Sequence, residues 1–521
     1  MFCEEDRKQI NAVKNNARIV ARIRGMRQIF RPGYEPGQCR PGEFIEGIML
    51  KGIFLLLSLS PIILISGTAR AATFAVNSNG DTFDAVAGDG ICADAIGNCT
   101  LRTAVDEANA LAGNDVINFD ASLTNSTITL TAGVQIVING VGGTLQINGL
   151  GANKLIVDGG PGSNRIFFTV GAANLNISNL TMQNGGAPGI GPDGSAVNAS
   201  GGTLVLDAVV VQNNNAGANN GGGIYYNGGV NHRILNSTIN NNSSANGGGL
   251  YLAGGTLFVA NSTISGNTIT GQGGGALLNG GAATMRNSTV TNNAANSIIG
   301  GIQSSGGVIF NIGNTIIAGN IASSFPDIGN FNGTVSVGNN FIGDSPGDSA
   351  NTITPIAYQP TDIQNQNPMF GILQNNGGPT PTHALNPGSL AINSGDNAKA
   401  VDPFDNSALT RDQRGYFPRA IFGNVDIGAF EFGAGPTAAS VSISGRVLAA
   451  TGNALGKAKL SLTNSGGETR FVVTNPFGYY RFDEVAVGET YILSVVSKQY
   501  AFTPQMVSVF DELTDLDFIS Q

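Results

Sequence analysis

A short pattern of apolar and polar positions recurs six times between residues 179 and 320 of this chain. In each copy an apolar residue is followed two positions later by Asn or Asp. A second apolar residue comes three positions after that, and usually a second Asn after three more. The copies start at Asn179, Asp207, Asn236, Asn261, Asn287 and Asn314, at steps of 25 to 29 residues. Repeats of this length indicate stacked units that can bury their apolar faces only against one another.

The repeats predict β-strands rather than helices. Helical repeats need apolar residues at spacings of three and four over ten or more positions. These segments are instead short, β-branched and alternating, and Gly and Asn interrupt them. Stacked coils pair such strands in parallel about 4.8 Å apart. We therefore predict an all-β chain whose residues 124–364 form a right-handed parallel β-helix of the pectate-lyase type.

The Asn or Asp that begins each copy falls in the same slot of successive coils. Side chains in one slot of stacked strands can hydrogen-bond to the side chains above and below them. The six residues that begin the copies are therefore predicted to form a ladder buried inside the turns, with neighbours such as Ser262 facing outward. Glycine runs at 221–223, 247–249 and 273–275 are expected at another corner, where the backbone turns with positive φ. No Lys-Ser/Thr follows these runs, so they do not indicate a P-loop.

Residues 72–123 are expected to cover the open end of the first coil. Residues 101–111 carry apolar positions at helical spacing, and a helix there would cover backbone groups that lack a neighbouring strand. The segment GDGICADAIGNCTLRTAVDEANA resembles the CSLREA domain, which is found at the N-terminus of secreted bacterial β-helix proteins. This chain has Thr103 where that family usually has Glu, so no role of that carboxylate can be carried over.

Residues 365–432 contain NGGPTPTHAL, DQRG and DIGAFE. These motifs resemble the tail of the choice-of-anchor Q family, whose members are exported β-helix proteins with various surface-attachment modules. The resemblance implies a C-terminal cap on the β-helix.

A Gly-Pro linker at 433–439 precedes the last piece of the chain, residues 440–521. Its alternating strands and glycine turns predict a small β-sandwich. The strings SGRV, TNPFGYYRF and VGETYILSVV resemble the carboxypeptidase regulatory-like, or transthyretin-like, domain. That resemblance implies no peptidase chemistry.

Residues 49–71 predict a secretory signal peptide cleaved after Ala71. They contain a methionine, a lysine, an apolar run and small residues at Ala69 and Ala71. A membrane anchor is the alternative, but the apolar run contains Pro61 and is shorter than the about 20 residues that a spanning helix needs. Residues 1–48 precede this signal, and we interpret them as a mis-assigned start or an extended N-terminal region.

Charge and cysteine content agree with export. The chain carries 26 basic and 35 acidic residues, a net charge of −9. Without residues 1–71 it would carry 15 basic and 29 acidic residues, a net charge of −14. Such a protein is not expected to bind nucleic acid or anionic lipid. In an oxidising compartment Cys92 and Cys99 are expected to form a disulfide, since two thiols alone do not complete a zinc site.

The regular coils offer little catalytic chemistry. A glycosidase needs two carboxylates about 5 to 10 Å apart, and residues 179–320 contain only Asp193 and Asp207. A lyase needs a strong base, and the same stretch has no Lys and no Glu. His232 is expected in a stacked slot, and His383 is expected to hold backbone in the cap. We predict no catalytic residue and no cofactor, although an active site on the irregular coils before 179 or under the cap stays open.

Acidic residues cluster in the predicted cap, with arginines between them. Ion pairs are the expected arrangement. A calcium site at Asp396, Asp402 and Asp405 is the alternative, because Ca²⁺ prefers oxygen ligands.

These features together favour an exported cell-surface or extracellular protein with a structural or adhesive role. Its outward rows of Asn, Ser and Thr, with Tyr479, Tyr480 and Tyr491 of the sandwich, suit binding of extracellular polysaccharide or cell-surface glycan, and the alternative is that they only solvate the rod. The alternative is a polysaccharide-active enzyme, either a lyase or a glycoside hydrolase.

Overall fold

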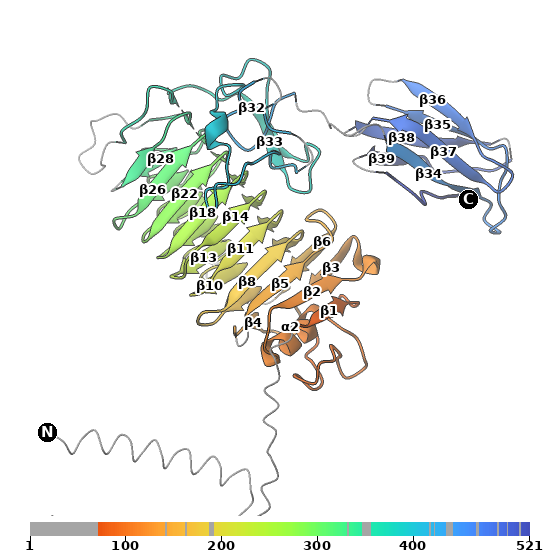
Figure 1. The fold of residues 1–521 in the computed structure, drawn as a ribbon, viewed down its shortest axis with the longest axis horizontal. Helices are drawn as coiled ribbons and strands as arrows, with labels where there is room; N and C mark the ends of the chain where they lie inside the picture. The colour runs from red at the N-terminus through yellow and green to blue at the C-terminus, as the bar shows by residue number, and fades with distance from the viewer. Residues whose placement is uncertain are drawn as a thin grey trace, which may run out of the picture. The chain divides into compact units, whose positions relative to one another are not determined.

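The computed structural model describes residues 71–521, apart from internal gaps. The gaps are 141–142, 162–163, 187–191, 331–332, 346–355, 416–417, 421–422, 434–440, 465–467, 487–488, 498 and 510–511. Residues 1–48 and the predicted signal peptide lie outside the described residues, except for Ala71. The described chain forms a parallel β-solenoid of about eight turns and a small β-sandwich, each treated by itself below (Figure 1).

Three parallel sheets make up the solenoid, and successive coils add strands side by side (Figure 1). The first sheet contains β1 (Thr73–Val76), β2 (Asp115–Phe119), β5 (Thr144–Asn148), β8 (Asn174–Ser178), β11 (Leu204–Asp207), β14 (His232–Leu235), β18 (Thr256–Ala260), β22 (Ala282–Arg286), β26 (Ile309–Gly313) and β29 (Thr334–Ser336). The second sheet contains β4 (Ile136–Ile138), β7 (Phe167–Thr169), β10 (Val197–Ser200), β13 (Ile224–Asn227), β17 (Leu250–Leu252), β21 (Ala276–Leu278), β25 (Ile302–Ser304) and β28 (Ile328–Asn330). The third sheet contains β3 (Ser126–Thr129), β6 (Leu155–Asp158), β9 (Thr181–Gln183), β12 (Val210–Gln212), β15 (Thr238–Asn240), β19 (Thr263–Ser265), β23 (Thr289–Thr291), β27 (Ile316–Ile317), β30 (Phe341–Ile342) and β31 (Ile363–Gln364). A short ladder joins β16 (Ser243–Ser244), β20 (Thr268–Ile269) and β24 (Ala294–Ala295). The predicted parallel solenoid is confirmed.

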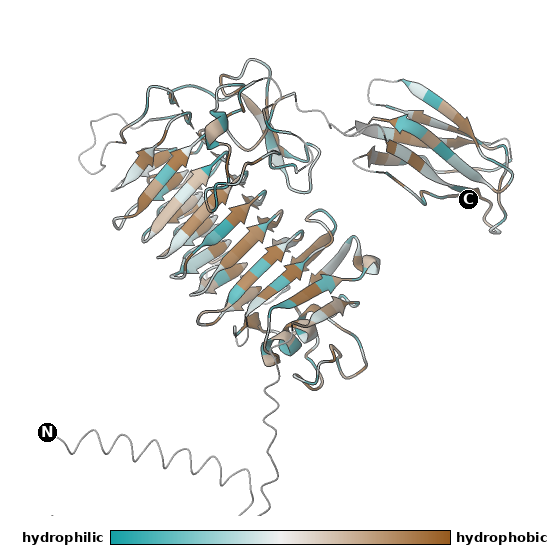
Figure 2. Cartoon of the chain, in the orientation of Figure 1, coloured by the Kyte–Doolittle hydropathy of each residue, from teal (hydrophilic) through white to brown (hydrophobic). Residues whose placement is uncertain are grey.

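Apolar and polar residues alternate along the strands of the solenoid (Figure 2), and the apolar ones enter the core. One inward row of the first sheet is at most 3% exposed in six successive coils. It consists of Ile177, Leu206, Ile234, Val259, Met285 and Ile312. Each such side chain contributes about 2 kcal/mol by leaving water, so the stacked rows stabilise the whole rod.

The second copy of the repeat lies one residue out of the predicted register. The repeat predicts Asp207 in the ladder slot, whereas Ala208 occupies it, as the pairing of β11 with β8 and β14 requires. Leu206 therefore faces the core, and Val205, which the pattern placed there, faces outward. Both residues are apolar, so the sequence admits two registers, and burial of the whole strand selects one of them.

The predicted ladder exists as two runs of hydrogen bonds, and Asn261, Asn287 and Asn314 are buried as predicted, at most 2% exposed, but the row lies at an outer corner of the coil. Its asparagines, Asn179, Asn236, Asn261, Asn287 and Asn314, adopt φ values of 46° to 57°, which Asn tolerates better than most residues. The side-chain amide of Asn236 donates to Asp207 at 2.8 Å, that of Asn261 to Asn236 at 3.2 Å, and that of Asn314 to Asn287 at 3.0 Å. The carboxylate of Asp207 thus reaches the ladder from the preceding position.

Ser262, expected to face outward, instead lies inside the turn and is 0% exposed. Its hydroxyl donates to Ala260 O at 2.7 Å and accepts from Ser237 N at 3.2 Å. Asn261 has the opposite orientation, because its left-handed backbone turns its side chain out of the coil.

A second row of asparagines forms the ladder inside the coil. Each amide nitrogen donates to the amide oxygen of the next coil at 2.8–3.0 Å. The row consists of Asn214, Asn242, Asn267, Asn293 and Asn320, none more than 7% exposed. It ends on the carboxylate of Asp327, which accepts from Asn320 at 2.8 Å. The repeat contains Asn242, Asn267, Asn293 and Asn320 of this row as its second Asn, and in the second copy, which is shifted by one residue, Asn214 takes the place of Asn213. The pattern does not distinguish the inner row from the outer one.

The glycine runs serve two purposes. The first glycine of three runs, Gly221, Gly247 and Gly273, has a φ of 61° to 71°, as the predicted tight turn requires. The glycines that follow are needed because successive coils approach closely. A Cβ on Gly248 would lie 2.5 Å from Gly274 O.

Helix α2 (Leu101–Ala110) lies where a helix was expected, at the mouth of the solenoid, and its apolar face joins the solenoid core. Thr100 and Thr103 form a capping box, in which Thr103 N donates to Thr100 Oγ1 at 3.1 Å and Thr100 N donates to Thr103 Oγ1 at 2.7 Å. Thr103 therefore helps to cap the helix. Within the described ranges, no helix is both long and apolar enough to cross a membrane.

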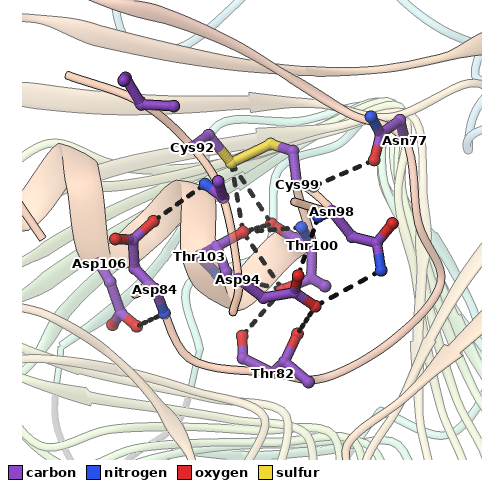
Figure 3. Close-up of a disulfide and its surroundings, with 12 residues drawn as sticks. Asn77, Thr82, Asp84, Cys92, Asp94, Asn98, Cys99, Thr100, Thr103 and Asp106 are labelled. Carbon is purple, nitrogen blue, oxygen red and sulfur yellow. Dashed lines mark hydrogen bonds between the residues drawn. A yellow bond between two sulfur atoms is a disulfide. The ribbon is translucent and has the colours of Figure 1, made fainter. Parts of the chain in front are cut away.

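The expected disulfide links Cys92 to Cys99, with their Cα atoms 5.0 Å apart (Figure 3). The loop between them is held by Asp94, whose carboxylate accepts from Thr82 Oγ1 at 2.8 Å and from Asn98 N at 2.8 Å. A short 3₁₀ helix, η1 (Ala121–Leu123), then leads into β3. The N-terminal segment is thus fixed by a covalent bond, a carboxylate and the helix together.

Residues 365–432, which we call the lateral segment, cover the outer face of the third sheet rather than the end of the solenoid. The segment contains the antiparallel pair β32 (Phe370–Gln374) and β33 (Thr382–Leu385) and a 3₁₀ helix, η2 (Asn397–Lys399). Hydrogen bonds tie it to β15, β19 and β23. The outward residues of β27 and β30 are the apolar Ile316 and Phe341, and they pack in one cluster with Ile427 and Phe430 of the segment. An outward apolar surface on these coils requires such a cover.

The C-terminal domain is a β-sandwich with its own core. One sheet has the order β37 (Tyr479–Val485), β34 (Val441–Leu448) and β40 (Phe518–Ile519). The other has the order β36 (Thr469–Val473), β35 (Lys459–Thr463), β38 (Glu489–Val496) and β39 (Gln505–Val509). The predicted sandwich is confirmed.

Candidate functional site

Charged side chains of the lateral segment are buried against the solenoid. Asp412, Arg414, Arg419, Asp426 and Glu431 are each at most 6% exposed. Arg414 pairs with Asp412 at 2.6 Å, and Arg419 Nη1 lies 3.8 Å from Glu431. Arg419 also donates to Asn261 Oδ1 at 2.7 Å, so the outer ladder and the lateral segment share one hydrogen-bond network. The interleaved arginines and acids of the sequence therefore form ion pairs here.

Burial governs the ionisation of this cluster. Burial first, and then the neighbouring Asp426 carboxylate, raises the pKa of Glu431 from 4.5 to about 7. Burial likewise raises the pKa of Asp426 and lowers that of Arg419. Because the groups are covered, the cluster holds the segment in place and is closed to a substrate.

We expect the lateral segment to become less stable as the pH rises from about 5 to about 8. The folded state binds the proton of Glu431 more tightly than the unfolded state does, so this stabilisation is complete below pH 4.5 and is lost as the pH rises through about 7. The change should be on the order of 3 kcal/mol, at about 1.4 kcal/mol per pKa unit. Hydrogen exchange of residues 365–432 across this pH range would measure it.

Glu431→Gln should remove most of that pH dependence, whereas Asp405→Asn, at an exposed carboxylate of the same segment, should leave it unchanged. Equal pH dependence in the parent and in Glu431→Gln would contradict the assignment.

The three aspartates considered for calcium have separate partners. Asp402 pairs with Arg233 of the first sheet, and Asp396 pairs with Lys399 at 2.9 Å. Asp405 accepts from a backbone N–H two residues further on at 2.9 Å. In the part of the chain that the structure describes, no three His, Cys, Asp or Glu side chains are arranged to hold a metal ion.

A serine and a histidine that the sequence does not connect meet between β19 and β33. Ser265 Oγ lies 2.9 Å from His383 Nε2, and His383 Nδ1 lies 2.7 Å from Gly371 O. A serine beside a histidine is the usual pair of nucleophile and base. Ser265 is only 2% exposed and His383 only 3%, and the third partner is a backbone carbonyl rather than a carboxylate. The pair therefore attaches β33 to the solenoid, and its 118-residue separation explains why no local pattern reveals it.

His232 lies inside the first sheet and is 0% exposed. Its Nδ1 accepts from Leu204 N at 3.0 Å, and its Nε2 lies 2.7 Å from Gly228 O. It pairs in register with Leu257, so it occupies the stacked slot that the repeat predicts.

A groove of about 250 Å³ lies where the lateral segment leaves the third sheet open. Its floor is formed by Ile156, Thr181 and Val210, the outward residues of β6, β9 and β12. Pro379 and Pro381 of the lateral segment line one side. The groove therefore crosses successive coils and has an apolar floor.

A row of amides flanks this floor. Gln212 Nε2 donates to Gln183 Oε1 at 2.9 Å, and Gln183 Nε2 donates to Asp158 Oδ2 at 2.9 Å. Asn184 donates to the same carboxylate oxygen at 2.7 Å. An apolar floor beside amide groups can contact both the C–H faces and the hydroxyl groups of a sugar chain.

A wider groove of about 590 Å³ lies beside α2. It is lined by Phe83, Arg102, Asp106, Asn109, Val134, Gln135, Val137 and Asn164. Arg102 is paired with Asp81 at 2.6 Å, and burial raises the pKa of Asp106. Asp106 is the one carboxylate among these lining residues.

The tyrosines of the sandwich divide between core and surface. Tyr480 and Tyr491, expected to contact glycan, are 4% and 6% exposed and belong to the core. Tyr479 is 51% exposed, beside Phe477 at 70%, and the guanidinium of Arg446 lies 4.6 Å from the Tyr479 ring centroid. Of the three tyrosines expected to contact glycan, only Tyr479 is exposed enough to do so.

Comparison with known families identifies one part of the chain. Residues 442–518 match the carboxypeptidase regulatory-like domain family, which confirms the resemblance seen in the sequence of the sandwich. No curated protein matches the chain. The resemblances of residues 72–123 to the CSLREA domain and of residues 365–432 to the choice-of-anchor Q family stay predictions.

Proposed function

We propose that the protein is an exported structural β-helix protein that binds extracellular polysaccharide along the open part of the third sheet. The groove over β6, β9 and β12 is the observation that carries this proposal, because it joins an apolar floor to a row of amides. An extended chain lying along the solenoid axis would contact equivalent positions on successive coils about 4.8 Å apart.

Export is supported by the start of the first coil. Ala72 N donates to Asp115 Oδ1 at 2.8 Å, and Asp115 is only 3% exposed. Cleavage after Ala71 would make that nitrogen an ammonium group and would convert the bond into a stronger, charge-assisted one. The disulfide between Cys92 and Cys99 suits an oxidising compartment.

The contacts of the histidines and of the buried acids support a structural role. Both histidines are buried and bonded through both ring nitrogens. The buried acids of the lateral segment are engaged in ion pairs or backbone bonds. These contacts stabilise a rod and its cover, and they leave the groove over the third sheet for binding.

A polysaccharide-active enzyme is the second candidate, and Asp106 is the observation that favours it. Its raised pKa and its place in the groove beside α2 suit a general acid. A glycosidase also needs a second carboxylate about 5 to 10 Å away, and the lining of this groove supplies Asp106 alone.

Binding and turnover can be measured on the same samples. The purified protein should be tested by affinity electrophoresis against neutral glucans, xylans and mannans and against polyuronates. We expect retention by at least one neutral polymer, and about tenfold weaker binding for Gln212→Ala, which removes an amide from the flanking row.

Gln146→Ala provides the matched control, because Gln146 is an exposed amide on the first sheet. Equal weakening by both variants, or no binding to any polymer, would contradict the proposed groove. New reducing ends or unsaturated uronates that are lost in Asp106→Asn would favour the enzyme instead.

A further inference from the structure

The amides beside the groove over β6, β9 and β12 have one direction, because a carboxylate stands at one end of their row. Strand register aligns Asp158, Gln183, Gln212 and Asn240 on successive coils. An ionised carboxylate can only accept hydrogen bonds, so Gln183 turns its NH2 group toward Asp158 and its carbonyl oxygen toward Gln212. Gln212 in turn donates to Gln183, which leaves Gln212 Oε1 as an acceptor.

The end of the row under the lateral segment therefore offers hydrogen-bond acceptors. Asn240 is 5% exposed, and its Oδ1 has no hydrogen-bond partner among the described residues. In the floor of the groove, Thr181 donates its own hydroxyl proton to Ala152 O at 2.6 Å, so its oxygen is also left to accept. A sugar hydroxyl can donate to such oxygens, whereas a carboxylate or a sulfate has no proton to donate.

A negative charge stands beside this otherwise uncharged groove. None of the residues that line the groove is charged. Asp158 lies two residues beyond the floor residue Ile156, or roughly 7 Å along β6, which is within the screening length at physiological salt. Lys154, an exposed base near the other end of this strand, folds back over Gly151, where a Cβ would lie 3.4 Å from Lys154 Cδ. The carboxylate is thus the charge that an occupant of the groove meets along β6.

We propose that the groove selects neutral, hydroxyl-rich polysaccharide chains and excludes polyuronates and sulfated chains, with Asp158 as the positioning residue that sets this selectivity. The inference rests on the proposed function and names the class of polymer that its groove binds. Asp158 acts in two ways, since its charge repels an anionic chain and its hydrogen bonds fix the direction of the amide row. Both effects disfavour an anion, and neither disfavours a hydroxyl group.

Isothermal titration calorimetry of the purified protein tests this with polymers that share a backbone and differ in charge. Hydroxyethylcellulose is compared with carboxymethylcellulose, and methyl-esterified galacturonan with galacturonan. A salt concentration of about 0.1 M screens charges far from the groove. We expect the neutral member of at least one pair to bind about tenfold or more tightly than its anionic counterpart.

Variants at position 158 should change this ratio. Asp158→Asn should lower the preference to about threefold or less, and Asp158→Lys should reverse it, with binding of the anionic polymer that weakens as salt is added. Asp89→Asn is the matched control, because it removes the same charge from an exposed position of the N-terminal segment and should leave the ratio unchanged. A purely structural loss would weaken both members of a pair alike, and thermal unfolding would establish that the variants are folded.

Equal binding of both members of each pair, through a site that Gln212→Ala weakens, would overturn this inference and leave the proposed function standing. A ratio that is unchanged in Asp158→Asn and Asp158→Lys, or that Asp89→Asn changes as much, would overturn it too. Absence of binding to every polymer would overturn the proposed function and this inference with it.

Discussion

Replacing Asn267 by leucine is expected to lower the free energy of unfolding of the solenoid by about 3–5 kcal/mol. Asn267 is 0% exposed. Its amide nitrogen donates to Asn293 Oδ1 at 2.8 Å and to Ile239 O at 3.0 Å. Its amide oxygen accepts from the backbone and side-chain nitrogens of Asn242, both at 3.0 Å. Leucine has a similar size but leaves these buried partners without a hydrogen bond, which costs more than the bonds themselves contribute.

Urea unfolding followed by circular dichroism would measure this cost. Asn227→Leu is the matched control, since Asn227 is exposed at the end of β13 and should change the free energy of unfolding by less than about 0.5 kcal/mol. Similar midpoints for the two variants would contradict the interior position of the inner ladder.

The period of the solenoid could be predicted from the sequence because it rests on local spacing. Apolar residues return at the same offset in each coil, and stacking turns that offset into a buried row. The same spacing predicted the second copy one residue out of register. Val205 and Leu206 are both apolar, so either can face the core, and Asp207 can stand for Asn in the ladder. A single-residue shift exchanges the two faces of a strand, so only the packing of the whole coil decides.

Which asparagine row lies inside could not be read from the pattern. Both rows recur at the same period and both are amides, yet Asn261 faces the lateral segment whereas Asn267 faces the core. The difference comes from the left-handed backbone at the outer corner, with φ of 48° at Asn261. It also explains why Ser262, the neighbour of Asn261, is buried.

The position of the lateral segment could not be predicted from the sequence. Its motifs indicated a cap, and its charges indicated ion pairs, but nothing local placed it along the side of the solenoid. The contacts that place it join residues far apart in sequence, such as Arg419 and Asn261, which are 158 positions apart. The Ser265–His383 pair is hidden for the same reason.

The fold of the sandwich could be predicted from the sequence, but which of its tyrosines are exposed could be predicted only in part. Tyr479 and Tyr480 are adjacent, so on a strand they point to opposite faces, and one of them must enter the core. The sequence alone does not tell which, because both faces of β37 carry aromatic or charged residues. Packing on Phe482 and Phe518 places Tyr480 inside.

Replacing Arg419 by methionine is the second change with a large expected effect, and it should detach the lateral segment from the third sheet. Arg419 is only 6% exposed and bonds to Asn261 Oδ1 and Gly428 O, at 2.7 and 3.1 Å. Methionine keeps the volume but leaves the carboxylates of Asp426 and Glu431 buried without this cation. Breaking a buried ion pair in this way costs about 3–5 kcal/mol.

Hydrogen exchange and limited proteolysis of residues 365–432 would report the release, while the inner ladder should stay protected. Arg411→Met is the matched control, because Arg411 is an exposed arginine of the same segment and its loss changes the net charge equally. The double variant Arg419→Met with Glu431→Gln should recover part of the lost protection, since it removes the acid that lost its partner. Protection of the lateral segment that is the same in Arg419→Met as in Arg411→Met would mean that the apolar cluster around Phe341 and Phe430 holds the segment without the ion pairs.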